Sequence, residues 1–259
     1  IQGGEFHSTP SIGISLFLSN ETSIDELLKR ADVAMYQAKD AGRNAIRFFD
    51  PAMQASLDAR IALIADLRQA LPHQQLHLDY QAQVDLHGRI FGAEVLLRWR
   101  HPQRGLISPG EFIPLAEESP LILDMGHWVL QTACAQIKAW RENPAASHLR
   151  LAVNVSARQF RQRDFAQQVA TVLRESGINP AQLKLELTES LVLDNIVDSI
   201  AKMQTLKKLG VGFSMDDFGT GHSSLSYLKQ LPLDQLKIDQ TFVRDIATDP
   251  NDAAIVQTI

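Results

Sequence analysis

The sequence predicts an α/β protein whose core is a parallel β-sheet. Six short, mostly apolar segments are expected to form strands, at residues 76–84, 90–97, 149–154, 183–187, 211–215 and 235–238. Helical patterns lie between most of them, and five of the six have an acid, an amide or a lysine at or near the carboxyl end. Short strands separated by helices favour a parallel sheet, either open or closed into a barrel.

Composition and charge limit the class of protein. The chain has 259 residues, of which 45% are hydrophobic and 21% charged, and this suits a globular protein with a sizeable core. The formal net charge of -5 argues against a duplex nucleic acid as partner. The sequence has no run of about 18 apolar residues and no signal peptide. We therefore expect a cytoplasmic location and no membrane contact by this segment.

The single cysteine, Cys134, excludes an intrachain disulfide and a thiolate metal cluster. It lies in an apolar helical pattern over residues 121–140, which we expect to pack on the sheet. We interpret its thiol as a packed core group. Upstream, Ser108 is expected to cap a helix that begins at Pro109.

Residues 1–49 form the first predicted unit. Strands are expected at 11–17 and 45–49, with an amphipathic helix between them. Ser23 and Glu26 have the spacing of a capping box at the start of this helix, and Gly42 ends it. A strand–helix–strand segment of this size cannot bury a core alone.

Residues 50–71 are predicted to form a connector helix that leads into a larger domain at 72–259. Apolar residues recur every three or four positions and give one stripe along it: Met53, Leu57, Ile61, Ile64, Leu67 and Leu71. A homodimer is expected, through this helix or through the larger domain.

The polar groups at the strand ends form the candidate site. In a (β/α)8 barrel the carboxyl ends of the strands share one rim, where active sites are built. Each group also has a structural interpretation, such as a solvated turn for the two aspartates, an ion pair for the first glutamate and a turn for the asparagine. Their presence on five successive strands favours a site made of Glu94, Asn154, Glu186, Asp216, Asp217 and Lys237.

The oxygen ligands of this set predict a hard cation. Carboxylate and amide oxygens suit Mg²⁺ or Mn²⁺, whereas zinc normally draws His or Cys. We interpret His101 and His222 as solvated or loop-packing residues. Two such ions beside a lysine suit the hydrolysis of a phosphodiester, in which the ions activate a water molecule. Lys237 would orient this water or offset charge in the transition state.

The first unit resembles a known family in part. Residues 28–39, followed by Gly42-Arg43-Asn44, resemble the C-terminal third of GGDEF domains, the diguanylate cyclase family. The stretch Gly3-Gly4-Glu5-Phe6 lies just before the 11–17 strand, whereas the signature hairpin of that family lies well upstream of this strand. The resemblance therefore implies that the catalytic half is absent and that this unit makes no cyclic dinucleotide.

From about residue 66 onward the chain resembles EAL domains, which are phosphodiesterases that open cyclic di-GMP to linear pGpG. In order, the motifs that carry the resemblance are Glu94-Val95-Leu96-Leu97-Arg98-Trp99, Asn154-Val155-Ser156, Glu186-Leu187-Thr188-Glu189-Ser190, residues 216–221 and Lys237-Ile238-Asp239. The resemblance implies a (β/α)8 TIM-like barrel with an antiparallel first strand. It also implies two Mg²⁺ or Mn²⁺ ions as cofactor and cyclic di-GMP as ligand.

The same resemblance implies roles for individual residues. Lys237 would position the attacking water, and Glu189 would brace the loop after the paired aspartates without binding metal. Arg98 would bind phosphate, and Gln81 and Asp239 would lie near the substrate. The implied metal ligands are Glu94, Asn154, Glu186, Asp216 and Asp217.

Three departures from the family pattern bear on these expectations. Val95 replaces an alanine and Ala82 replaces a usual proline. The sequence also stops at Ile259, before two βα units that carry another Glu and a Gln in the family, so we expect the domain to be truncated here. Besides a metal-dependent phosphodiesterase, two hypotheses stay open: a non-catalytic receptor for cyclic di-GMP, and a fragment without activity.

Overall fold

The computed structural model describes residues 9–18, 22–219, 228–244, 246–249, 253, 254 and 256. The chain forms two compact units, Ile1–Gln69 and Ala70–Ile259, and each is described by itself. The stretch 3–6 and His222, both interpreted above, lie outside the described residues. Among the described helices, none combines the length and apolar character that a membrane crossing requires.

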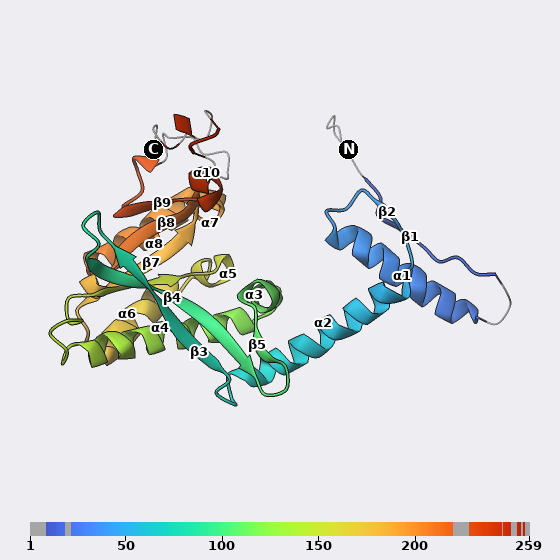
Figure 1. Cartoon of the computed structure of the whole chain (residues 1–259), viewed down its shortest axis with the longest axis horizontal. Coiled ribbons are helices and arrows are strands. Elements are labelled where there is room, and N and C mark those ends of the chain that lie inside the picture. Colours follow the sequence, from blue (N-terminus) through green and yellow to red (C-terminus); the bar gives the residue numbers. More distant parts are fainter. Residues whose placement is uncertain are drawn as a thin grey trace. The chain divides into compact units, whose positions relative to one another are not determined.

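The first unit contains two short parallel strands joined through a helix. β1 (Ile12–Ile14) pairs with β2 (Ile46–Phe48), and α1 (Ile24–Asp40) lies between them in the chain (Figure 1). Ser23 accepts a hydrogen bond from the amide of Glu26 (3.2 Å), which is one half of the predicted capping box. The Glu26 side chain pairs with Arg30 instead of returning to the cap, so the other half of that prediction is wrong.

β1 runs close against α1 at Gly13. A Cβ on this residue would lie 2.0 Å from the carbonyl oxygen of Ala31 and 2.3 Å from the amide nitrogen of Met35. Only glycine fits this approach of strand to helix.

The predicted connector is a single helix, α2 (Pro51–Ala70). Asp50 caps it by accepting a hydrogen bond from the amide of Ala52 (2.8 Å), and Pro51 occupies its first position. Leu63, Leu67 and Ala70 are buried. The buried residues of this helix thus lie in its C-terminal half.

The described part of the second unit is built on a seven-stranded sheet. The strands are β3 (Leu76–Val84), β4 (Ile90–His101), β5 (Gly105–Ile107), β6 (Arg150–Asn154), β7 (Leu183–Thr188), β8 (Gly212–Phe218) and β9 (Gln235–Ile238). Their order is β3-β4-β6-β7-β8-β9, with β5 beside β4. β4 and β6 to β9 are parallel, whereas β3 and β5 are antiparallel to β4. This arrangement confirms the predicted antiparallel first strand.

Three details of the sheet differ from the prediction. The sequence pattern does not predict β5, and β4 and β8 extend beyond their predicted ends to His101 and Phe218. The extra length of β4 provides the edge on which β5 pairs. β3 and β9 lie at the two ends of the described sheet, and none of its described strand pairings joins them. The described strands thus form an open part of the predicted barrel.

Three helices pack on one face of this sheet, namely α4 (Leu121–Trp140), α6 (Phe165–Ser176) and α8 (Ile196–Lys208) (Figure 1). Cys134 is fully buried in the core between them and the strands, which confirms its prediction. The shorter elements are α3 (Pro109–Glu117), α5 (Ala157–Phe160), the 3-10 turn η1 (Pro180–Gln182), α7 (Glu189–Asp194) and α10 (Gln240–Arg244).

Two local predictions near these elements can be compared with the structure. Ser108 occupies the N-cap position of α3, but its side chain makes no capping hydrogen bond, so the predicted cap is wrong in that respect. The carbonyl group of Ser108 instead accepts the amide of Glu111 (2.9 Å). His101 is buried, and its Nδ1 accepts the amides of Gln103 and Arg104, so it packs within its own turn.

Side-chain alternation along the strands separates the core from the candidate site. On β7, residues Leu183, Leu185 and Leu187 belong to the core with the helices. Neighbouring side chains point to opposite faces, so Lys184 and Glu186 lie on the other face. The same alternation places polar residues of the other strands there: Asn154, Ser214, Asp216, Gln235 and Lys237. The face away from the core helices is therefore polar.

Candidate active site

Three carboxylates meet on the polar face of the sheet, with Glu186 and Asp216 near the carboxyl ends of β7 and β8 and Glu94 in the first half of β4. Oxygen atoms of Glu94, Glu186 and Asp216 lie within 4.8 Å of one another, a spacing that could hold a metal ion. The parallel register brings them together, because Asn154 of β6 pairs with Glu186 and Thr188 of β7 pairs with Asp216. We call these three residues the carboxylate cluster.

Lys237 of β9 contacts all three members of the cluster. Its Nζ donates to Glu94 Oε2 (2.9 Å), Glu186 Oε2 (2.9 Å) and Asp216 Oδ2 (3.1 Å). Burial alone would lower the pKa of Lys237, but the hydrogen bonds and charges of the carboxylates raise it above its ordinary value. Lys237 therefore stays positively charged among three acids.

Glu186 is the most buried member of the cluster, with 1% of its surface exposed. Burial raises its pKa, while the hydrogen bond and charge of Lys237 oppose that rise. Its Oε1 atom is buried and has no hydrogen-bond partner among the residues that the structure describes. A buried carboxylate oxygen without a donor needs a cation or a water molecule to satisfy it. Together with the all-oxygen donor set, this orphaned atom fits a divalent metal such as Mg²⁺ or Mn²⁺.

Asn154 and Gln81 border the cluster beside Glu94. Asn154 Nδ2 donates to Glu94 Oε1 (2.9 Å). Gln81 pairs with Glu94 across β3 and β4, and both line a cavity of about 330 Å³ together with Lys237. Both predicted residues therefore lie next to the carboxylates.

A bulge separates the two adjacent aspartates. The register of β8 with β9 is regular at Met215 and resumes only at Phe218. Asp217 lies in this irregularity with a φ of 53°, a left-handed conformation that costs roughly 1–3 kcal/mol for a residue with a side chain. Partial burial and the charges of Asp216 and Asp239 raise its pKa. Asp217 thus lies outside the carboxylate cluster, beside Asp239.

Asp239 and Glu189 make contacts that hold neighbouring segments. Asp239 accepts hydrogen bonds from the hydroxyl and the amide of Thr241 at the start of α10, and these lower its pKa. Glu189 is buried at the start of α7, and its Oε2 accepts the amide of Gly219 (3.2 Å). Glu189 therefore contacts the residue that follows β8 and is not part of the carboxylate cluster.

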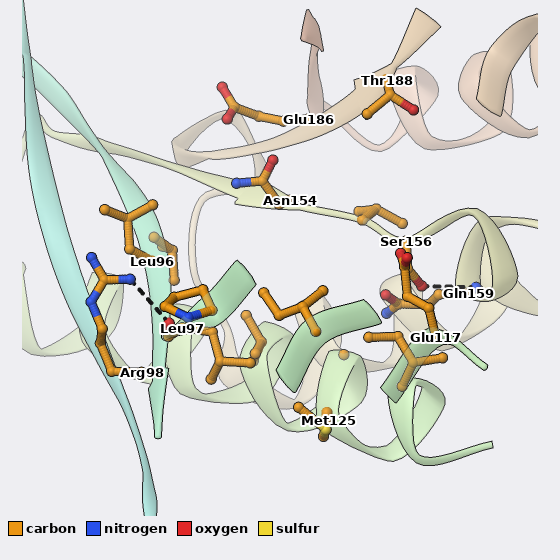
Figure 2. Close-up of a pocket in the computed structure, with 17 residues that line it drawn as sticks. Leu96, Leu97, Arg98, Glu117, Met125, Asn154, Ser156, Gln159, Glu186 and Thr188 are labelled. Carbon is orange, nitrogen blue, oxygen red and sulfur yellow. Dashed lines mark hydrogen bonds between the residues drawn. The ribbon is translucent and has the colours of Figure 1, made fainter. Parts of the chain in front are cut away.

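A second cavity, of about 260 Å³, opens beside the cluster (Figure 2). Arg98 of β4, Asn154 of β6 and Glu186 of β7 are among its lining residues. The remaining lining is mostly apolar. Val95, Leu96 and Leu97 of β4 belong to it, and α3 and α4 contribute Pro109, Ile113, Ile122, Met125 and Val129. The sequence does not distinguish these helical residues from core residues, because both kinds give the same apolar helical pattern.

Arg98 is fixed at this cavity by two contacts. Its Nε donates to Asp79 Oδ2 (2.9 Å), and its Nη1 donates to the carbonyl oxygen of Leu97 (3.1 Å). Our sequence reasoning missed Asp79. The signal that could have found it is the period of two along β3, which places it on the same face as Gln81.

Two known protein families match parts of this chain. Residues 64–259 match the family described as EAL domain, and residues 1–45 match the family described as diguanylate cyclase, GGDEF domain. The bifunctional diguanylate cyclase/cyclic di-GMP phosphodiesterase MucR of Pseudomonas aeruginosa is 45% identical over 256 residues, which cover 98% of this chain and 37% of MucR. The cyclic di-GMP phosphodiesterase PdeR of Escherichia coli is 38% identical over 255 residues, 98% of this chain and 38% of PdeR.

The chain thus spans less than half the length of these two relatives. Among solved structures, the MucR phosphodiesterase in complex with c-di-GMP has a TM-score of 0.73 at 46% identity, and the match covers 76% of this chain and 80% of that one. This likeness confirms the predicted fold class. Because the match extends over residues 64–259, the chain belongs to the EAL domain family, and it carries a fragment of a GGDEF domain at its N-terminus.

Proposed function

We propose that this chain is the catalytic part of a metal-dependent phosphodiesterase that hydrolyses cyclic di-GMP to linear pGpG. The observation that carries the proposal is the carboxylate cluster around Lys237, next to a cavity that Arg98 lines. The MucR structure in complex with c-di-GMP, at 46% identity, supports the choice of ligand.

We assign two Mg²⁺ or Mn²⁺ ions to the site. When bound, such ions polarise the scissile phosphate and lower the pKa of the attacking water. The orphaned Oε1 of Glu186 supports this assignment. The residues that would hold the ions are Glu94, Asn154, Glu186, Asp216 and Asp217.

Lys237 and Arg98 are two positively charged side chains at the proposed site. The ammonium of Lys237 would orient the attacking water and offset the negative charge that grows on the phosphate oxygens. Asp79 fixes the guanidinium of Arg98, whose planar fork matches the geometry of a phosphate group. The apolar remainder of the adjoining cavity suits a flat guanine base.

The proposal gives the other predicted residues supporting roles. Gln81, beside Glu94, and Asp239, beside Asp217, would lie near the substrate. Glu189 would brace the loop after β8 through its hydrogen bond to Gly219. These contacts support the roles that the EAL resemblance implies.

We also propose how the chain is organised. Residues 1–49 would be the C-terminal part of a GGDEF domain, 50–71 a connector helix and 72–259 the phosphodiesterase domain. We propose a cytoplasmic location and a homodimer through the phosphodiesterase domain or the connector. The exposed apolar side chain of Ile61 on α2 supports the second of these dimer arrangements.

A direct assay tests the proposed function. The purified chain is incubated with cyclic di-GMP and Mg²⁺ or Mn²⁺, and the nucleotides are separated by chromatography. We expect pGpG to form with either metal and not with excess chelator. Tight binding of cyclic di-GMP without any pGpG would contradict the enzyme and favour the receptor hypothesis.

A further inference from the structure

One buried lysine crosses the polar face of the sheet beneath the carboxylate cluster. Lys184 lies on β7, two residues before Glu186 and on the same face. It is 6% exposed, and its Nζ donates to Oε1 of Gln235 on β9 (2.5 Å). Lys184 therefore links β7 to β9 across the intervening strand β8.

Small residues beside Lys184 leave room for this link. Its partners in register are Ala152 on β6 and Gly212 on β8. A Cβ on Gly212 would lie 3.6 Å from Cγ of Lys184, in van der Waals contact. A longer side chain at position 212 would compete for the path that Lys184 takes to Gln235. The two small neighbours thus suit a lysine that spans three strands.

The segment before β9 is held to β8, because Asp234 Oδ2 accepts the amide of Phe213 (2.7 Å), and Leu236 packs against the core. β9 itself is short. It has four residues, and all of them are partly exposed. Its regular pairing with β8 covers Gln235 and Leu236 before the bulge interrupts the register. Lys237 lies two residues beyond Gln235 and on the same face. The hydrogen bond between Lys184 and Gln235 therefore acts on the same face of β9 that carries Lys237.

We propose that the Lys184–Gln235 hydrogen bond is a positioning contact for Lys237. It holds β9 beside β7, so that Nζ of Lys237 reaches all three carboxylates at 2.9–3.1 Å. Lys184 and Gln235 touch no reacting atom in this account and act only through Lys237. The catalytic consequence rests on the proposed phosphodiesterase function.

Four variants of the full chain test this contact. Lys184→Met keeps the apolar stem and removes the donor, and Gln235→Leu removes the acceptor. For each we expect kcat to fall about tenfold, a usual effect for residues that orient a catalytic group, while KM changes less than about twofold. Gln235→Glu keeps the acceptor and should stay within about twofold of the parent chain. The double variant should lose no more activity than either single variant, because both remove one contact.

A control variant and a second readout separate positioning from general stability. Lys202 on α8 is also buried, 8% exposed, and donates to the carbonyl oxygen of Phe160 (2.9 Å). Lys202→Met should lower the unfolding temperature and leave kcat unchanged. The second readout is the NMR signal of the Lys237 side chain, recorded without substrate. Lys184→Met should shift this signal, and Lys202→Met should not.

Each outcome decides the proposal. An unchanged Lys237 signal in Lys184→Met would overturn the positioning contact. An unchanged kcat would overturn it as well. Additive losses of activity in the double variant would also do so, because the two residues would then act separately. If the parent chain hydrolyses no cyclic di-GMP, the proposed function fails, while the Lys237 signal still decides whether Lys184 positions this lysine.

Discussion

Asp216 is the residue whose substitution tests the carboxylate cluster most directly. Asp216→Asn keeps the size of the side chain and removes one charge from a group that Lys237 contacts at 3.1 Å. We predict that the hydrolysis rate falls at least about a hundredfold, because metal binding and charge stabilisation each contribute several kcal/mol to such reactions. Asp58→Asn, at an exposed carboxylate on α2, is the matched control and should leave the rate unchanged. Near-normal hydrolysis by Asp216→Asn would contradict the assigned site.

The thiol of Cys134 is buried in the core, where ionisation is unfavourable. Burial raises the pKa of its thiol to about 11, and a hydrogen bond with Ser176 opposes that rise. Because the folded value lies above the reference value of 9.0, the stability linked to the neutral thiol is present below pH 9.0 and is lost as the pH rises through about 11.

We therefore predict that Cys134 in the folded chain reacts with a thiol reagent at pH 8 at least about a hundredfold more slowly than in denaturant. The rate of labelling, followed by mass spectrometry, measures this difference. Equal rates in the two conditions would mean that the thiol is accessible and that α4 does not pack as described.

At the scale of elements, the approach of α4 to α5 shapes the cavity beside the cluster. A Cβ on Gly126 of α4 would lie 2.3 Å from Oε1 of Gln159, whose side chain lines that cavity and is 4% exposed. Replacing glycine by alanine ordinarily stabilises a helix interior by about 1 kcal/mol. Here the added methyl group must displace the Gln159 amide.

Gly126→Ala is therefore predicted to weaken binding of cyclic di-GMP about tenfold, the cost of roughly 1.4 kcal/mol of lost contacts. Calorimetry in the presence of chelator measures binding without turnover. Gly110→Ala on α3 is the control, since its Cβ would meet only ordinary contacts, the nearest being Ser108 Oγ at 3.7 Å. Equal affinity in the two variants would show that the Gly126 side of the cavity does not contact the ligand.

Much of the sheet could be predicted from the sequence, because its strands are short apolar segments between clear helical patterns. β9 and α4 begin and end where the pattern places them. The bulge at Asp217 could not be predicted, since it arises from the pairing of β8 with β9, which a single segment does not contain. β5 has three residues, too few to show alternation.

The candidate site shows the same division between local and long-range information. Acids at or near the ends of the predicted strands are visible in the sequence, and the register of the sheet brings Glu94, Glu186 and Asp216 together. Lys184 and Asp79 were missed, because their partners lie 51 and 19 residues away in the chain. A lone charged residue within a strand gives no sign of which residue it will meet.

At the scale of the whole molecule, the two units differ in how well they bury apolar surface. In the second unit one continuous core extends from β4 to β8 and includes α4, α6 and α8. In the first unit α1 buries Val33, Ala34 and Ala38, while Leu16, Phe17 and Phe48 are more than half exposed. Because apolar burial is the main stabilising contribution, the first unit is expected to unfold at the lower temperature.

This difference leads to a prediction about ligand-linked stability. The carboxylate cluster and both cavities beside it lie in the unit Ala70–Ile259. Mn²⁺ alone, without a substrate that would be turned over, should therefore raise the unfolding temperature of that unit and not of the other. At a ligand concentration of 100 times Kd the added stability is about 2.7 kcal/mol. The three tryptophans, Trp99, Trp128 and Trp140, all belong to the second unit, so their fluorescence follows its unfolding separately, while calorimetry records both transitions. Asp216→Asn should abolish the rise in unfolding temperature that tryptophan fluorescence reports. An equal shift of both calorimetric transitions would show that the units unfold together. An undiminished shift in Asp216→Asn would place the metal elsewhere.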